Sequence, residues 1–194
     1  MIASIRTAVI AMVVFTLALG LAYPLLSVAG SQLIAPDGSE GSLIEKDGEV
    51  VGSRLIGQSF AGHLQYFQER PSQSHYAGEA TFFSNYGPNG EDTVEAFNAN
   101  ADKYLKREGR YNPGLDRGDI PPSAVMTSAS GIDPHIDPDD AAIQAHRIAE
   151  VRDIPLDRVN DLIDEYTDGR ALWILGDPGV NVLELNLALD REEN

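Results

Sequence analysis

Three groups of residues carry side chains that could do chemistry. The run Asp133-Pro134-His135-Ile136-Asp137 offers carboxylate oxygens and an imidazole nitrogen, which are donors that metal ions accept. Ser128 and Ser130 offer hydroxyl groups within the stretch TSASG. Gln144 and Arg147 lie three residues apart and therefore neighbour one another if this region is helical. Each group forms a site only if the fold brings further residues to it.

None of these groups has the spacing of a catalytic motif. TSASG is not the G-x-S-x-G nucleophile elbow, and no glycine-rich loop is followed by the lysine of a phosphate-binding loop. The Asp-Lys-Thr-Gly phosphorylation loop of a P-type pump is missing, and a chain without cysteine has no thiolate nucleophile or ligand. We therefore predict no catalytic residue, and the residues by themselves indicate no bound cofactor.

Metal binding is also not expected. The two prolines around His135 favour a rigid turn that leads into a helix, rather than a set of converging ligands. His63, His75 and His146 lack the spacing of a triad or an H-x-x-x-H pair, so we expect them to be exposed.

For Gln144 and Arg147 two interpretations stay open. One is a solvated or locally paired polar face, which periodicity favours, and the other is a contact for a ligand or partner.

The charge of the chain is strongly negative and unevenly placed. There are 14 basic and 30 acidic side chains, and Arg6 is the one charged residue before Asp37. The acidic remainder repels phosphate backbones and anionic lipid headgroups, which excludes nucleic-acid binding as a function. An acidic surface with only three lysines favours an organism living in high salt, where screening removes the self-repulsion, although an ordinary acidic domain is the alternative.

The N-terminus predicts one membrane span. Residues 7–29 are uncharged and would make a helix of about 34 Å, enough to cross the hydrocarbon core. A cleavable signal ending at Ala29 is the alternative, but the apolar run is longer than a normal signal core. Arg6 favours an N-terminus inside the cell and an acidic domain outside. We thus divide the chain into an anchor, 1–33, and a soluble domain, 34–194, in a single-pass protein of the cell membrane.

The soluble domain shows helical and extended patterns, so we predict an α+β fold. The predicted elements are a hairpin turning at Asp47-Gly48, helices over about 93–107, 138–152 and 156–167, and a strand within 180–189. Asp137 should cap the second helix, with Pro138 at its first position. The prediction of a strand is based on four leucines at every second position, starting at Leu183. One span and one domain exclude a pore or a multidomain enzyme.

Several stretches, taken in order, resemble the C subunit (KdpC) family of potassium-transporting P-type ATPases over nearly the whole chain. They are Tyr23-Pro24-Leu25, Gly41-Ser42-Leu43-Ile44, the block 52–60, Tyr66-Phe67, Arg70-Pro71-Ser72, Ser84-Asn85, the block 127–136, Ala141-Ala142, Gln144, Arg147-Ile148-Ala149, Arg152 and the block 180–190. The block 127–136, TSASGIDPHI, is the most specific of them.

The resemblance implies a non-catalytic subunit that assembles or stabilises a potassium transport complex. Its partners would be a channel-like potassium-translocating subunit and the P-type ATPase subunit, with lipid around the span. The family is also described as a catalytic chaperone that raises the ATP affinity of the pump subunit, which implies ATP as a ligand and Gln144 as a nucleotide contact. The residues that carry the structural or partner-facing signature would be Ser128, Ser130, Gly131, Asp133, Arg147, Asn181 and Asn186.

Two further hypotheses remain beside that one. A domain outside the cell cannot touch cytoplasmic ATP, so the topology expected from Arg6 conflicts with a nucleotide role for Gln144. An acidic, membrane-anchored module that collects cations at the outer face of a pore is the alternative function. A secreted hydrolase would need a nucleophile that the sequence does not offer.

Overall fold

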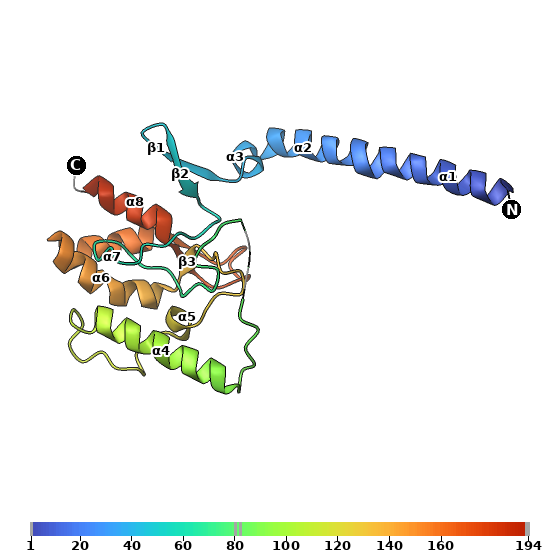
Figure 1. Cartoon of the computed structure of the whole chain (residues 1–194). Helices are drawn as coiled ribbons and strands as arrows, with labels where there is room; N and C mark the ends of the chain where they lie inside the picture. Colours follow the sequence, from blue (N-terminus) through green and yellow to red (C-terminus); the bar gives the residue numbers. More distant parts are fainter. Residues whose placement is uncertain (1, 80, 82, 193–194) are drawn as a thin grey trace. The chain divides into compact units, whose positions relative to one another are not determined.

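The uncharged N-terminal stretch folds as one continuous helix. In the computed structural model, which describes residues 2–79, 81 and 83–192, α1 (Ile2–Leu17), a π-helical turn (Ala18–Ala22) and α2 (Tyr23–Ile34) follow without a break (Figure 1). The segment Ser4–Ile34 is 31 residues long, its most apolar window has a mean hydropathy of 2.3, and none of that window is buried. The prediction of one apolar N-terminal helix is confirmed, and the helix extends beyond 7–29 at both ends.

The π-helical turn has a local cause in the sequence. Pro24 lacks a backbone N–H, and in a regular helix its ring would press on the carbonyl group of Gly20. The backbone widens there, so the Tyr23 N–H bonds to the Ala18 carbonyl five residues back instead of four. The helix therefore passes the proline without ending.

A short hairpin follows the helix. After α3 (Pro36–Ser39), strands β1 (Leu43–Lys46) and β2 (Glu49–Ser53) pair with each other. Asp47 and Gly48 have φ angles of +57° and +81°, which is the geometry of the two-residue turns that match strand twist. The predicted hairpin is confirmed. The chain divides into two units at this hairpin, Met1–Val51 and Gly52–Asn194.

The second unit is an α+β domain, as predicted. Its elements are α4 (Glu91–Glu108), α5 (Pro122–Val125), β3 (His135–Ile136), α6 (Pro138–Arg152), α7 (Leu156–Glu165), β4 (Thr167–Asp168), β5 (Gly179–Asn181) and α8 (Val182–Glu192). The three predicted helices are α4, α6 and α7, and α6 has the bounds expected from its sequence. The strands form a small antiparallel sheet in the order β3-β5-β4.

The expected strand over 180–189 is wrong for most of its length. Only the first residues extend, as β5, and the rest is the helix α8. The buried positions of α8 are Val182, Leu183, Leu185, Asn186, Ala188 and Leu189. These positions recur at three and four residues, so the segment satisfies a helical period as well as the alternation of its leucines. The packing of α8 against α7 and β5 decides between the two.

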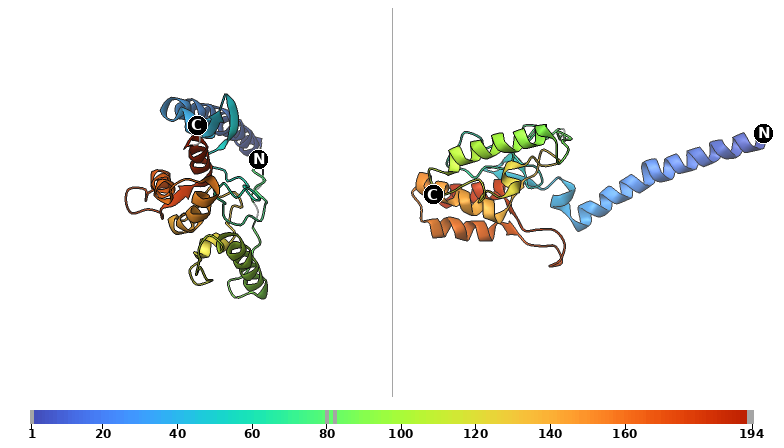
Figure 2. Two further views of the ribbon diagram at one scale, coloured as in Figure 1. Left: turned by 90° about the vertical axis from the view of Figure 1, so that its left-hand side faces the viewer. Right: turned by 90° about the horizontal axis from the view of Figure 1, so that it is seen from below.

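The helices of this unit form layers, with α6 between α4 and α7 (Figures 1 and 2). The larger apolar core joins α6, α7, α8 and the sheet, and it also takes in Phe67 from a segment without regular structure. A smaller core lies under α4 and α5 around Tyr104 and Val125. Between the two cores, α4 and α6 are joined by two buried polar pairs, Tyr104 with Asp140 and Glu108 with Arg147, and Ile143 of α6 packs against the smaller core.

Candidate functional site

The segment Leu64–Gln68 crosses the domain without regular structure, yet side chains bind its backbone throughout. Asn186 of α8 accepts a hydrogen bond from the Phe67 N–H at 2.8 Å and donates one to the Phe67 carbonyl at 3.0 Å. Gln144 of α6 does the same with Gln68, at 2.8 and 3.0 Å. The two amides thus supply what a neighbouring strand would supply, which a buried backbone requires.

Two arginines of α6 bind the remaining carbonyl groups of the segment. Arg147 donates through Nη1 to the carbonyl oxygens of Leu64 and Tyr66. Arg152 donates through Nε to the Gln65 carbonyl at 2.7 Å. All five carbonyl groups from Leu64 to Gln68 therefore accept a hydrogen bond from a side chain of α6 or α8. We call these four side chains, Gln144, Arg147, Arg152 and Asn186, the backbone clamp.

A fully buried ion pair lies beneath the clamp. Arg147 and Glu108 each have 0% exposure, and Nε of Arg147 lies 3.1 and 3.0 Å from the two carboxylate oxygens of Glu108. Burial lowers the pKa of Arg147, while the Glu108 charge opposes that shift. A buried charge is tolerated only when it is paired, so losing Glu108 would leave Arg147 as a costly isolated ion, whereas Glu108 also has Arg107 as a partner. The pair joins the C-terminal end of α4 to α6.

Asp140 extends the network toward the second core. Its Oδ1 accepts hydrogen bonds from the Tyr104 hydroxyl at 2.7 Å and from Nε2 of Gln144 at 3.0 Å. Burial raises the pKa of Asp140 to about 6, although both hydrogen bonds oppose the shift. Oε1 of Gln144 also accepts from Arg147 at 2.9 Å, so both polar atoms of the Gln144 amide are engaged twice.

Of the polar face expected at Gln144 and Arg147, the solvated form is wrong, whereas the local pairing is present, since Arg147 donates to Oε1 of Gln144 at 2.9 Å. Both side chains are buried, and their hydrogen bonds reach residues that lie far away in the sequence. One signal in the sequence indicates this, because Gln144 continues the spacing of the buried residues Ala141, Ala145 and Ile148. The acidic partners, Glu108 and Asp140, were not identified from the sequence. Glu108 lies at the C-terminal end of a predicted helix, where a negative charge is unfavourable unless a cation is close, and this could have indicated a basic partner.

The signature block 127–136 forms a turn that glycine makes possible. Gly131 has a φ of +75°, and its N–H donates to Oγ of Ser128 at 2.9 Å. Oγ of Ser130 accepts from the Ile132 N–H at 3.2 Å. The hydroxyl groups of the two serines thus shape the turn.

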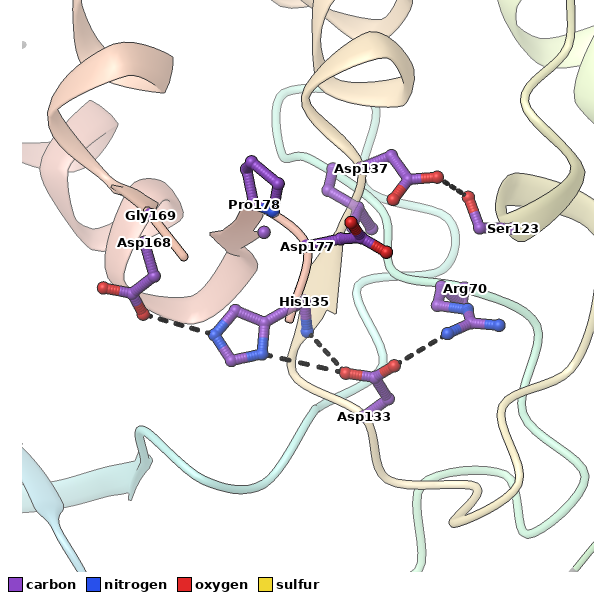
Figure 3. A pocket seen from close by; sticks show the side chains of 11 residues that line it. Arg70, Ser123, Asp133, His135, Asp137, Asp168, Gly169, Asp177 and Pro178 are labelled. Atoms are coloured by element: carbon purple, nitrogen blue, oxygen red, sulfur yellow. Dashed lines mark hydrogen bonds and ion pairs between the residues drawn. The ribbon is translucent and has the colours of Figure 1, made fainter. Parts of the chain in front are cut away.

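Asp133 leads from this turn into a cleft of about 310 Å³ (Figure 3). Its carboxylate accepts from Arg70 at 2.8 Å and from the His135 backbone N–H at 3.1 Å. Burial would raise the pKa of Asp133, but the hydrogen bonds from His135 and the Arg70 charge outweigh it and lower the pKa. Asp133 and, on the other side of the ring, Asp168 raise the pKa of His135.

This cleft has an acidic lining, but its acids have partners. Besides Asp133 and Asp168, it is lined by Asp137 and Asp177. Asp177 pairs with Arg170 at 2.7 Å, and Asp137 accepts from the Ser123 hydroxyl, as Figure 3 shows. Across the described residues, no three His, Asp or Glu side chains converge in a way that would hold a metal ion. His63, His75 and His146 are exposed, as expected.

Two helix starts differ in how they are capped. Asp137 precedes α6 as predicted, but its side chain makes no cap hydrogen bond, because it binds Ser123 instead. The expected side-chain cap at Asp137 is therefore wrong, although its position and Pro138 are right. Asn181 provides the cap that the sequence did not suggest: its Oδ1 accepts from the Glu184 N–H at 3.2 Å at the start of α8.

A second cleft, of about 340 Å³, lies between the segment 59–76 and α4. Three cationic side chains, Arg70, Lys103 and Arg107, line it together with Glu69. Burial raises the pKa of Glu69 to about 8, and among the described residues its Oε2 finds no hydrogen-bond partner. The raised pKa favours the protonated form of Glu69, while Arg70 is paired with Asp133 and Arg107 with Glu108.

Comparison with known proteins gives a consistent likeness along the chain. The family model described as KdpC, K+-transporting ATPase, c chain, matches residues 5–191. The Potassium-transporting ATPase KdpC subunit of Methylococcus capsulatus is 42% identical over 193 residues, which is 98% of each chain. That of Caldanaerobacter subterraneus is 40% identical over 179 residues, 92% of this chain and 90% of the relative. That of Nitratidesulfovibrio vulgaris is 43% identical over 172 residues, 87% and 84% of the two chains.

Proposed function

Because this chain belongs to the KdpC family, the c chains of K+-transporting ATPases, we propose that it is a non-catalytic, membrane-anchored subunit of a potassium transport complex. In this proposal the N-terminal helix holds the chain in the membrane. The domain 52–194 provides a rigid surface on which the potassium-translocating subunit and the ATPase subunit assemble. Membership of the family is the reason to place the chain in such a complex, and the architecture of the domain supports an assembling role there.

The observation that carries the assembling role is the complete engagement of the backbone clamp. Gln144 has 0% exposure, and its amide already binds Gln68, Asp140 and Arg147. A nucleotide could reach this amide only after the segment 64–68 had left it, which would expose the buried pair of Arg147 and Glu108. The residue that the family resemblance offers as a nucleotide contact is thus better explained as a structural brace.

A chaperone role that raises the ATP affinity of the pump subunit is retained in an indirect form. A rigid subunit that stabilises one conformation of its partner changes that partner's ligand affinity without touching the ligand. This form is also compatible with a domain outside the cell, which is the topology that Arg6 favours. The effect would then depend on subunit contacts and not on Gln144 itself.

The cation-collecting module is the second candidate, and the acidic cleft in Figure 3 favours it. Four aspartates line this cleft, in a domain (52–194) that carries 25 of the 30 acidic side chains of the chain. Such a surface raises the local concentration of cations without a specific site. We rank it below the assembling role because Asp133 and Asp177 are occupied by arginines.

The experiment is purification of the tagged full chain from detergent-solubilised membranes, followed by mass spectrometry of its partners. We expect the two larger subunits of the ATPase to copurify, and the complex without this chain to be recovered in lower yield. A chain that purifies alone, from membranes that contain the assembled ATPase, would contradict the proposal. Right-side-out spheroplasts treated with protease test the topology separately.

A further inference from the structure

The connection between β4 and β5 carries a cluster of exposed apolar side chains. Leu172, Trp173, Ile174 and Leu175 are 76, 91, 75 and 56% exposed. They form the tip of a hairpin, which Figure 2 shows projecting from the helices of the domain. We call these four residues the apolar tip. Adjacent large apolar side chains that add nothing to their own core mark a site of interaction.

The backbone of the apolar tip is fixed and not a loose loop. Ala171 and Leu175 exchange two hydrogen bonds of 2.9 Å, and the Ile174 N–H closes the turn on the Ala171 carbonyl. Leu172 and Trp173 have φ angles of +52° and +64°. Asparagine and glycine adopt this geometry with little strain, whereas leucine and tryptophan do so at a cost. The turn therefore presents bulky side chains where ordinary turn residues would fold more easily.

The charges beside the tip narrow down what it binds. Asp168 and Asp177 flank the hairpin with 75 and 84% exposure, and each also has a basic neighbour, His135 at 3.5 Å and Arg170 at 2.7 Å, so the acidity of the domain as a whole adds to theirs. A membrane with anionic headgroups would meet these carboxylates in a domain that is acidic overall, and so would a second copy of the chain. A protein surface that combines an apolar recess with basic side chains at its rim fits both features.

We propose that the apolar tip inserts into an apolar, basic-rimmed recess of another subunit of the ATPase and anchors this chain to it. Trp173 is the central side chain, because buried tryptophans dominate the binding energy of protein interfaces. Its rigid turn lowers the entropy lost on docking. The inference rests on the proposed membership of a complex and adds the surface that makes the contact.

The first test uses the absence of cysteine in the chain. Ile174→Cys, labelled with a benzophenone maleimide in the assembled complex, should crosslink to another subunit on illumination. Val94→Cys on α4, which is 55% exposed, is the matched control and should not give the same product. Crosslinking of Ile174→Cys to a second copy of this chain, or to lipid alone, would overturn the proposal.

The second test separates this inference from the proposed function. Trp173→Ser should lower the affinity of the full chain for the other subunits by roughly thirty-fold, while Val94→Ser leaves it unchanged. Both variants should keep the wild-type melting temperature, since Trp173 is 91% exposed. Recovery of the Trp173→Ser complex at wild-type affinity would refute the tip as an anchor and leave the proposed function intact. Failure of the wild-type chain itself to copurify would refute the proposed function.

Discussion

Replacement of Gln144 by alanine separates a structural role for the backbone clamp from a nucleotide contact. In the folded domain the Gln144 side chain holds both backbone polar groups of Gln68, a residue that is 6% exposed. Gln144→Ala removes the partners of this N–H and this carbonyl group at once. It also takes one hydrogen bond each from Asp140 and Arg147, which keep others.

The magnitude follows from the two orphaned backbone groups. A buried polar group without a partner costs about 1–3 kcal/mol, which gives about 2–6 kcal/mol for both. Water can enter the space that the shorter side chain vacates and satisfy part of this demand. We therefore expect the free energy of unfolding to fall by about 2–4 kcal/mol. For a domain of this size, that lowers the melting temperature by about 5–15 °C.

The assay combines stability with ATPase kinetics on the same preparations. Unfolding of the full chain in detergent should show the loss for Gln144→Ala and for Gln144→Met, which fills the space without hydrogen bonds. His146→Ala, an exposed neighbour on the same helix, is the matched control and should be neutral. The complex that still assembles with Gln144→Ala should keep the wild-type KM for ATP. An unchanged melting temperature with a several-fold higher KM would refute the clamp and establish the nucleotide contact.

Three further results are expected. Burial raises the pKa of Glu69 to about 8, so its contribution to the free energy of unfolding is complete below pH 4.5 and is lost as the pH rises through 8. Glu69→Gln should flatten this pH dependence in unfolding experiments between pH 6 and 9. Equal slopes for the wild type and the variant would contradict the raised pKa of Glu69. Asp137→Ala and Ser123→Ala should each cost about 1 kcal/mol and be non-additive in a double-mutant cycle, whereas a cap at Asp137 independent of Ser123 would make them additive. If the acidic surface is adapted to high salt, the melting temperature should rise from low to molar salt, and a fall would exclude the adaptation.

The sequence determined the parts of this protein that depend on local patterns. The uncharged run near the N-terminus, the Asp47-Gly48 turn and the helix that begins at Pro138 each follow from residues close together in the chain. Hydrophobicity, turn chemistry and helical period act over a few residues, so they can be read without the fold. The family resemblance, carried by ordered short stretches, is likewise confirmed by the family model.

Tertiary structure alone decided the parts that depend on distant partners. The segment 180–189 satisfies two periods at once, and only packing against α7 and β5 makes most of it a helix. Gln144 and Arg147 look like polar surface residues until the segment 64–68 and Glu108 are placed against them. A polar side chain is buried only when partners satisfy its hydrogen bonds, and here those partners lie 39 to 83 residues away in the sequence. No local pattern encodes such pairings, so the backbone clamp becomes visible only in the folded domain.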